Sequence, residues 1–232
     1  MLDRVAAAVL GLVLAPVLAA LVAWIRWADG PPGVLGLVRM GRRGRRFRMW
    51  KLRTMSVAQP SGRAGGAILT AGDDLRVTAV GARLRRLRVD ELPQVVNVVK
   101  GEMSLIGSRP EAVELVDAAD PAWSEVLEVP PGITGATQLV VHEWEERVMA
   151  GGGDHVERYR TVVLPVKLAV DRWYVRRGSP VVDATIVWSM VERFVLGRGT
   201  TAIDRLVRRE VAEADVVPLT GEEPDGGPVV PS

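Results

Sequence analysis

Residues Val5 to Ile25 form an unbroken run of 21 side chains without a charged or polar group. At about 1.5 Å per residue, a helix of this length is sufficient to cross a hydrocarbon layer of about 30 Å. Pro16 lies near the middle of the run, and an interior proline removes a backbone hydrogen bond and kinks or breaks a helix. The sequence therefore predicts a membrane segment. It is either a kinked helix that crosses the bilayer or a re-entrant helix that breaks at Pro16, and physics alone does not choose between them.

The segment after this run is strongly basic. Eight basic and no acidic residues lie between Arg39 and Arg53, and such a segment is retained in the cytoplasm and suits an anionic inner leaflet. A secretory signal peptide is a weaker interpretation, because the apolar run is longer than a signal core and is followed by these charges.

Charge is divided unequally along the chain. Residues 1–110 hold 18 basic and 7 acidic residues, a balance of +11, whereas residues 111–232 hold 12 and 21, a balance of −9. A basic half beside a bilayer suits lipid headgroups, phosphorylated substrates or nucleic acid, and charge alone does not choose among them.

Length and composition limit the remaining options. A chain of 232 residues, 48% of them hydrophobic, accommodates a membrane element and one compact domain. It contains no cysteine, which excludes disulfides, thiol catalysis and thiolate metal sites. His142 and His155 are too few and too far apart in sequence for a histidine-rich metal site.

Local patterns predict a mixed domain that is mostly helical. Two strands are expected at 34–40 and 45–54, around Gly41-Arg42-Arg43-Gly44. A flexible loop is expected at 59–66, and the acidic, Gly- and Pro-rich tail at 211–232 should be mobile. The helices are expected at 80–88, 92–99, 110–116, 162–176 and 181–196.

The chemistry is concentrated in residues 83–110. Pro93 suits the first turn of a helix, which places Asp90 and Glu91 at its N-terminus, where free N–H groups stabilise a carboxylate or bind phosphate. Leu92, Val95, Val96 and Val99 are expected to form one apolar stripe on this helix. A helix cap and a nucleophile look alike at such a position.

Nearby arginines favour catalysis over capping, because they would hold an anionic substrate against an ionised carboxylate. They are Arg85, Arg86, Arg88 and Arg109, although an arginine-rich solvated or lipid-facing helix remains an alternative. Adjacent carboxylates also suit Mg²⁺, which takes one or two protein carboxylates and shares phosphate oxygens with its substrate. An aspartate that attacks phosphorus would form an acyl phosphate and divide one difficult displacement into two easier ones.

Six ordered blocks of this sequence resemble the bacterial sugar transferases, the monotopic polyprenyl-phosphate phosphoglycosyl transferases. The blocks are the N-terminal apolar segment, FRMWKLRTM (47–55), DDLRVTAVGARLRR (73–86), VDELPQVVNVVKGEMSLIGSRP (89–110), PGITGATQL (131–139) and DRWYVRRGSPVVD (171–183). They cover most of residues 1–200.

The resemblance implies an enzyme that moves a phospho-sugar from a UDP-sugar to polyprenyl (undecaprenyl) phosphate and releases UMP. It implies that Asp90 is the nucleophile and that Glu91 supports Mg²⁺ binding or proton transfer, with both carboxylates as candidate metal ligands. It also implies a re-entrant helix broken near a Ser-Pro pair, which is Ala15-Pro16 here, so no serine hydroxyl is present at this position. The family's Pro-Arg-Pro is Ser108-Arg109-Pro110, which retains the arginine as a phosphate-contact candidate.

Further candidates for substrate or phosphate contact are weaker. Lys51 and Arg53 are expected to position phosphate or to contact lipid. Arg76, with Asp73 and Asp74, either anchors a loop at the site or belongs to a surface turn, and Arg86 belongs to the arginine cluster. Gln138 follows Gly-Ile-Thr-Gly and is either a site residue or a buried amide.

Four aromatic side chains fit either an interfacial belt or the core, with the core favoured. They are Trp173, Tyr174, Trp188 and Phe194.

The combined prediction is an α+β, mostly helical protein at the cytoplasmic face of a bacterial inner membrane. It has a re-entrant helix at 1–28, a catalytic domain at 29–210 and a flexible tail at 211–232. UDP-sugar, polyprenyl phosphate, membrane lipids and Mg²⁺ are the expected partners, without nucleic acid, and a homodimer is left open. A catalytically silent membrane scaffold and a nucleic-acid-binding protein are the alternatives. The sequence does not indicate which sugar is used.

Overall fold

The computed structural model describes residues 2–56, 76–150 and 154–212. The expected loop at 59–66, Asp73, Asp74 and nearly all of the expected tail lie outside the described residues. The first half contains α1 (Leu2–Asp29), β1 (Val34–Met40), η1 (Arg42–Gly44), β2 (Arg46–Leu52), α2 (Ala79–Arg86), η2 (Val89–Gln94), α3 (Val95–Lys100), β3 (Ser104–Ile106) and η3 (Val113–Leu115). The second half contains α4 (Pro121–Val126), β4 (Gly132–Thr134), α5 (Ala136–Val140), α6 (His142–Met149), α7 (His155–Arg158), the π-helical turn η4 (Tyr159–Val163), α8 (Leu164–Arg177), α9 (Pro180–Phe194) and α10 (Ala202–Ala212).

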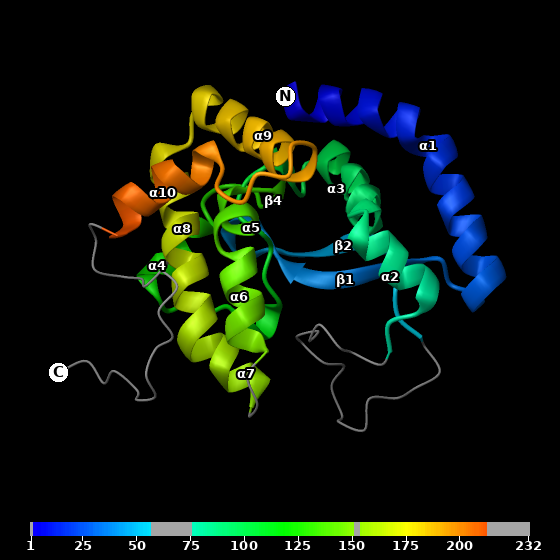
Figure 1. The fold of residues 1–232 in the computed structure, drawn as a ribbon, viewed down its shortest axis with the longest axis horizontal. Coiled ribbons are helices and arrows are strands. Elements are labelled where there is room, and N and C mark those ends of the chain that lie inside the picture. Colours follow the sequence, from blue (N-terminus) through cyan, green and yellow to red (C-terminus); the bar gives the residue numbers. More distant parts are fainter. Residues whose placement is uncertain (1, 57–75, 151–153, 213–232) are drawn as a thin grey trace.

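The structure confirms a mostly helical α+β architecture with a long apolar N-terminal helix. In Figure 1, α1 lies along one edge of the molecule, and the α4–α10 helices gather at the opposite side. α1 bends along its length, but it remains helical through Pro16 from Leu2 to Asp29. The expected break is therefore a bend in this structure. Among the described helices, α1 is the one that is long and apolar enough to cross a membrane.

Two short sheets lie between these helical parts. β1 pairs with β2 in an antiparallel hairpin, with Val34 opposite Leu52 and Met40 opposite Arg46. The hairpin predicted from the sequence is thus confirmed, with β2 slightly shorter than expected. β3 pairs in parallel with β4, which joins the segment before Arg109 to the segment before α5.

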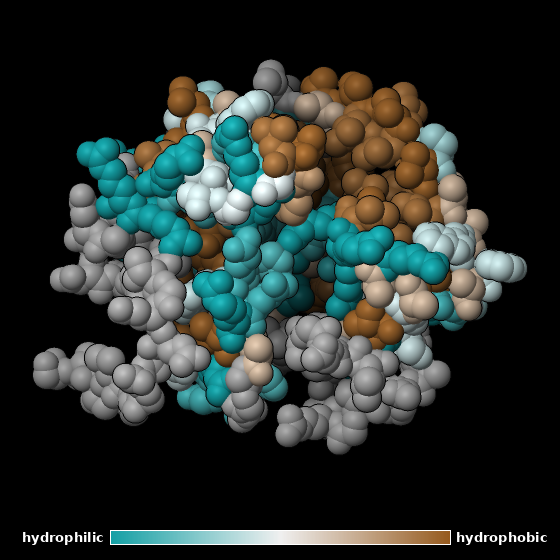
Figure 2. Space-filling model, viewed as in Figure 1, coloured by the Kyte–Doolittle hydropathy of each residue, from teal (hydrophilic) through white to brown (hydrophobic). Residues whose placement is uncertain are grey.

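Both ends of α1 pack against the rest of the chain. Near its start, Ala7 is buried in a cluster with β2 and α3, and near its end Ile25 is buried in a cluster with β2 and α2. Much of the surface between these ends is exposed, including Leu12 at 79% and Val13 at 66%. Figure 2 shows this apolar surface as a continuous brown area at the upper right, over α1.

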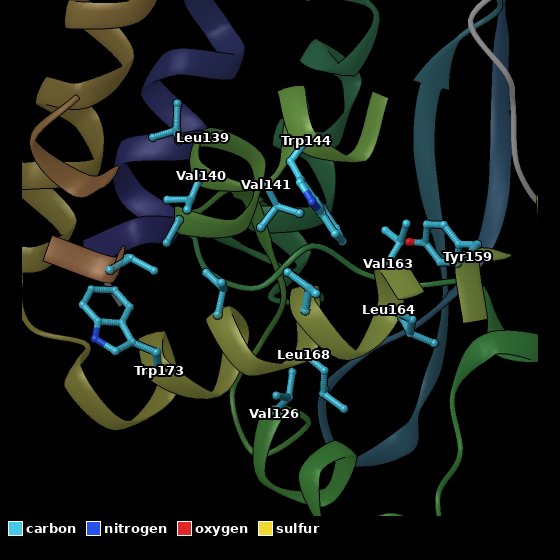
Figure 3. Packing of buried hydrophobic residues seen from close by; sticks show 14 of the residues in the cluster. Val126, Leu139, Val140, Val141, Trp144, Tyr159, Val163, Leu164, Leu168 and Trp173 are labelled. Atoms are coloured by element: carbon cyan, nitrogen blue, oxygen red, sulfur yellow. The ribbon is translucent and has the colours of Figure 1, made fainter. Parts of the chain in front are cut away.

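The largest core lies among the C-terminal helices (Figure 3). Trp144 on α6, Val163 at the end of η4 and Trp173 on α8 are buried together there, and Ile203 brings α10 onto the same core. Trp173 is therefore a core residue, as the sequence favoured, and Tyr174 packs against the same cluster. Two further aromatic side chains lie at the surface instead, Trp188 at 53% exposure and Phe194 at 51%.

Two expected helical features are wrong. Residues 110–116 form only the single turn η3, because Ala112, immediately before this turn, has an extended backbone. The apolar stripe on the helix after Asp90 is also displaced, since Val95 and Val98 are buried whereas Val96 and Val99 are 43% and 42% exposed. The reason is that α3 packs against both α1 and β2, so its buried face is not the one that an isolated helix pattern selects.

Candidate active site

Asp90 and Glu91 lie in η2, the 3₁₀ turn that leads directly into α3. Arg88 immediately precedes this turn and lies two residues before Asp90. It has a left-handed backbone conformation, with φ of 53°. This conformation is uncommon for a residue with a side chain, and it separates α2 from η2. The Asp90 side chain is nearly buried, with 5% of it exposed.

Two basic side chains from distant segments meet these carboxylates. Lys51 Nζ, from β2, lies 2.8 Å from Asp90 Oδ2 and 3.5 Å from Glu91 Oε1. Arg109, from the loop after β3, forms a bidentate pair with Glu91, with its two terminal nitrogens 2.6 Å and 3.2 Å from the two carboxylate oxygens. The structure thus brings together Lys51, Asp90, Glu91 and Arg109, four of the residues predicted from the sequence.

The electrostatics of Glu91 follow from these contacts. Burial alone would raise the pKa of Glu91, but the charges and hydrogen bonds of Arg109 and Lys51 outweigh burial and lower that pKa to about 2. The Glu91 carboxylate in turn raises the pKa of Arg109 above its ordinary value. Planar bidentate pairs of this type fix orientation as well as charge. Glu91 is therefore an anion at physiological pH that holds the guanidinium group of Arg109 beside Asp90.

Asn97 fixes the spacing between β2 and the turn that carries Asp90. Its side-chain amide is fully buried; Oδ1 accepts a hydrogen bond from Trp50 N at 3.1 Å, and Nδ2 donates to Arg48 O and Glu102 Oε2, both at 2.7 Å. Two of these bonds satisfy backbone groups of β2 on either side of Met49, just before Lys51. This role of Asn97 was not predicted from the sequence, although a single amide inside the apolar run Val-Val-Asn-Val-Val was a visible signal.

The position of Arg109 depends on a close approach of two backbone segments. Gly107 N donates to Thr134 O at 2.9 Å, and Gly132 N donates to Ser108 O at 2.7 Å. A Cβ atom on Gly132 would lie 2.1 Å from Gly107 N, and one on Gly135 would lie 2.0 Å from Gly107 O. The glycines of the Ile-Gly-Ser-Arg-Pro and Pro-Gly-Ile-Thr-Gly motifs are thus needed for packing around Arg109.

A buried cluster anchors the chain two residues after Arg109. Lys167 Nζ lies 2.9 Å from Glu111 Oε1 and donates to Tyr159 OH at 2.6 Å, and Tyr159 OH donates to the same Glu111 oxygen at 2.8 Å. Lys167 and Tyr159 are 6% and 2% exposed. These residues were not predicted from the sequence, because they come from three separated segments.

The other predicted contact residues lie elsewhere. Arg53 is 2% exposed and donates to the carbonyl oxygens of Gly30 and Pro31, so it holds the turn after α1 rather than contacting lipid or the carboxylate pair. Arg86 is exposed on α2. The backbone oxygen of Arg76 accepts a hydrogen bond from the backbone N–H of Ser56 at 2.7 Å, at the border of residues 57–75, which the structure does not describe. Gln138 Nε2 donates to Ile133 O at 2.9 Å, which fits the structural amide that was the alternative for this residue.

The candidate metal ligands are limited to the two adjacent carboxylates. Within residues 2–56, 76–150 and 154–212, no group of three or more His, Cys, Asp or Glu side chains is placed to hold an ion. Asp90 and Glu91 nevertheless fit Mg²⁺, which uses few protein ligands and completes its shell with phosphate oxygens and water. Their charges are already paired with Lys51 and Arg109, so these residues suit an ion that arrives with a phosphorylated substrate.

A second buried carboxylate, Asp171 on α8, gives a test of the core. Burial raises its pKa to about 7, although Thr137 Oγ1 donates a hydrogen bond to it and Lys167 is near. A carboxyl group whose pKa is higher in the folded state than in the unfolded state favours the protonated form on folding. Its contribution to the free energy of unfolding is therefore present below about pH 4 and is lost as pH rises to 7.

We therefore expect Asp171→Asn to stabilise the protein above pH 7, by on the order of 2 kcal/mol, and to flatten the loss of stability between pH 4 and pH 7. Urea unfolding at several pH values measures both effects. Asp117→Asn, at an exposed position, is the control and should leave the pH dependence unchanged. An identical pH dependence in Asp171→Asn and wild type would contradict the assignment.

Known sequences match both the site and most of the fold. Residues 1–197 match the bacterial sugar transferase family. An exopolysaccharide production protein, ExoY, of Sinorhizobium fredii is 35% identical over 128 residues, which cover 55% of this chain and 49% of that protein. A UDP-N-acetylgalactosamine-undecaprenyl-phosphate N-acetylgalactosaminephosphotransferase of Aeromonas hydrophila is 38% identical over 137 residues, 58% of this chain and 29% of that protein.

A third relative is the UDP-glucose:undecaprenyl-phosphate glucose-1-phosphate transferase of Caulobacter vibrioides, 36% identical over 140 residues, which cover 59% of this chain and 47% of that protein. The matched region thus spans about half or less of the length of these three relatives. The family match, in contrast, includes α1, the hairpin, the four site residues and the core helices up to α9. The chain belongs to the bacterial sugar transferase family.

Proposed function

We propose that this protein transfers a sugar-1-phosphate from a UDP-sugar to undecaprenyl phosphate and releases UMP, as the first membrane step of exopolysaccharide or glycan assembly. The observation that carries the proposal is the nearly buried Asp90 carboxylate, 2.8 Å from Lys51 Nζ and adjacent to the Glu91–Arg109 pair. The Aeromonas and Caulobacter relatives are named for transfers of this kind, and the Sinorhizobium relative is named for exopolysaccharide production.

The first step is attack by an Asp90 carboxylate oxygen on the β-phosphorus of the UDP-sugar. The bond between this phosphorus and the bridging oxygen breaks, and UMP leaves with the electron pair. The product on the enzyme is an acyl phosphate that carries the sugar. In the second step, a phosphate oxygen of undecaprenyl phosphate attacks the same phosphorus. Asp90 leaves as a carboxylate, and the lipid product is undecaprenyl diphosphate-sugar.

Lys51 and Arg109 supply the positive charge that this chemistry needs. A carboxylate and a diphosphate repel each other, and phosphoryl transfer depends mainly on positioning and charge neutralisation. Lys51 contacts both carboxylates and is 21% exposed, so its ammonium group is placed to contact the incoming β-phosphate as well. Arg109 is fixed by Glu91 and is 30% exposed, which leaves part of its guanidinium edge for phosphate oxygens.

Mg²⁺ is the proposed cofactor, and Asp90 and Glu91 are the residues that would hold it. When bound, the ion would neutralise charge on the diphosphate. Glu91 would serve this ion while still orienting Arg109, because a carboxylate has lone pairs for more than one partner.

We propose that α1 is re-entrant and places the protein at the cytoplasmic face of the inner membrane. Asp3, at the start of α1, accepts hydrogen bonds from Ser104 Oγ and from Leu105 N, and Asp29, at its end, accepts one from Thr78 Oγ1 at 2.8 Å. A straight helix of this length would extend over about 40 Å. Both ends instead contact one domain, so a crossing would require this domain to face both sides of the bilayer.

This topology predicts labelling of both helix ends from the cytoplasmic side. Because the chain contains no cysteine, Arg4→Cys and Trp27→Cys each provide one thiol at an exposed position near an end of α1. A membrane-impermeant maleimide should label both variants in inverted membrane vesicles and neither in intact spheroplasts. Labelling of Arg4→Cys in spheroplasts would show a crossing helix instead.

The reaction is tested by UMP release from a panel of UDP-sugars, with undecaprenyl phosphate and Mg²⁺, by protein purified in nanodiscs. Acceptor-dependent UMP release with at least one donor is expected, and the active donor identifies the sugar. A catalytically silent scaffold would give no UMP with any donor. Salt-sensitive binding of DNA or RNA without UMP release would instead support the nucleic-acid alternative.

A further inference from the structure

An apolar groove of about 350 Å³ lies between α1, the β1–β2 hairpin and the η2–α3 segment. Its lining residues are Leu18, Val22, Val34, Trp50, Leu52, Pro93, Val96 and Lys100. A cavity of this volume falls in the range of small-ligand sites. Among these described lining residues, Lys100 is the only one that carries a charge. The groove therefore suits an apolar chain that ends in an anionic group, and it does not suit a polar nucleotide sugar.

The wall formed by Trp50 is fixed in place. Trp50 lies opposite Gly36 in the hairpin, and a Cβ atom at Gly36 would lie 3.1 Å from the indole ring. The absence of a side chain at Gly36 thus allows the ring to lie against the backbone of β1. Asn97 holds the backbone of Trp50, and Lys100 Nζ lies 5.7 Å from the centre of its ring. The groove is therefore built by defined contacts rather than by loose side chains.

The groove shares its elements with the reactive residues. Trp50 precedes Lys51, whose ammonium group pairs with Asp90, and Pro93 lies in the same 3₁₀ turn as Asp90. On its other side, Leu18 and Val22 belong to α1, whose exposed apolar surface is the part suited to the bilayer. A ligand in this groove thus contacts both the membrane helix and the segments that carry the nucleophile.

We propose that this groove binds the isoprene units of the lipid acceptor that lie next to its phosphate, and that Val96 and Trp50 select this chain. The inference rests on the proposed function, because it assumes a polyprenyl phosphate as the acceptor. A phospholipid acyl chain has similar apolar chemistry, but it has no reason to lie beside Asp90 and Lys51, whereas the acceptor must reach them.

The test uses two matched tryptophan substitutions on α3. Val96 and Val99 have nearly equal exposure, 43% and 42%, but only Val96 lines the groove. Val96→Trp should fill the groove and raise the KM for undecaprenyl phosphate about tenfold, equivalent to about 1.4 kcal/mol. Val99→Trp should leave this KM unchanged. Leu18→Trp, from the opposite wall, should reproduce the effect of Val96→Trp and guards against a local folding defect in α3.

Two readouts separate acceptor binding from the first chemical step. Val96→Trp should keep the wild-type amount of UMP released in the absence of acceptor, because that step uses only the donor. A benzophenone-tagged farnesyl phosphate should crosslink to peptides of α1, β2 or α3 in wild-type protein. Undecaprenyl phosphate should compete with this labelling, and Val96→Trp should reduce it.

The outcomes distinguish the groove from the reaction. Labelling that undecaprenyl phosphate prevents and that Val96→Trp reduces would support the groove as the acceptor site, even if no UDP-sugar releases UMP. In that case only the proposed function fails. If wild type releases UMP but Val96→Trp and Val99→Trp have the same acceptor KM, the groove assignment is overturned. Labelling that phosphatidylglycerol removes as well as undecaprenyl phosphate does would also overturn it, because the groove would then hold membrane phospholipid.

Discussion

Asp90→Asn should lower acceptor-dependent UMP release by at least about a thousandfold, with the folded structure retained. The amide is nearly the same size as the carboxylate, so the η2 turn and the packing around it should persist. It lacks the negative charge and the nucleophilic oxygen that the first step needs. Lys51 retains Glu91 as an ionic partner at 3.5 Å, which limits the structural cost of the change. Steady-state assays of UMP release measure the loss.

Two controls accompany this variant. Thermal unfolding should show that Asp90→Asn folds, and Asp117→Asn, which removes an exposed carboxylate outside the site, should retain wild-type activity. If Asp90→Asn turned over at the wild-type rate, Asp90 would be a structural cap of the η2 turn and the proposed nucleophile would be wrong.

Arg109→Gln should reduce kcat/KM for the UDP-sugar by about a hundredfold to a thousandfold. The change removes a positive charge beside the transferred phosphate and releases Glu91 from its bidentate partner. It should also change the pH dependence. Arg109 is a main cause of the low pKa of Glu91, about 2, so its removal should raise that pKa. Activity that depends on ionised Glu91 should then begin to fall at a higher pH than in wild type. Rate profiles between pH 4 and pH 8 measure this shift.

Arg176→Gln is the matched control, because Arg176 also pairs with a glutamate, Glu125, but on the exposed side of α8. It should leave both kcat/KM and the pH profile unchanged. Arg109→Lys should restore part of the activity, since it returns the charge without the planar fork. Equal effects of Arg109→Gln and Arg176→Gln would show that Arg109 has no special relation to the substrate.

Local patterns predicted those elements whose cause is local. The hairpin follows from alternating strands around a Gly-Arg-Arg-Gly turn, and α8 and α9 lie close to their expected ranges. The placement of Asp90 before a helix followed from Pro93. In contrast, the buried face of α3 depends on two neighbours, α1 and β2, which the pattern of a single helix does not contain. That is why Val96 was expected to lie in an apolar stripe with Val95 but lines an open groove instead.

Only part of the site was predicted, because local patterns do not contain the contacts between its distant segments. Arg109 was a candidate from motif resemblance and Lys51 from its place in the basic segment, but only the fold shows that Lys51 pairs with Asp90 and Arg109 with Glu91. Arg53 lies two residues from Lys51 in the same basic segment, so no sequence pattern distinguished the two. Arg53 faces the turn after α1, because β2 ends at Leu52 and the guanidinium group of Arg53 donates to the carbonyl oxygens of Gly30 and Pro31. Asn97 and Lys167 were missed since their partners lie far away in sequence.

In the proposed mechanism, Asp90 becomes covalently bound to the phospho-sugar. The most direct measurement is mass spectrometry of the protein after rapid mixing with the active UDP-sugar and Mg²⁺, without acceptor, followed by peptide mapping. We predict an added mass of one sugar-phosphate on the peptide that contains Asp90. This added mass should disappear when undecaprenyl phosphate is added, and it should be absent in Asp90→Asn. An active enzyme that releases UMP only when acceptor is present, and never carries this adduct, would contradict the two-step mechanism and indicate direct transfer between the two substrates.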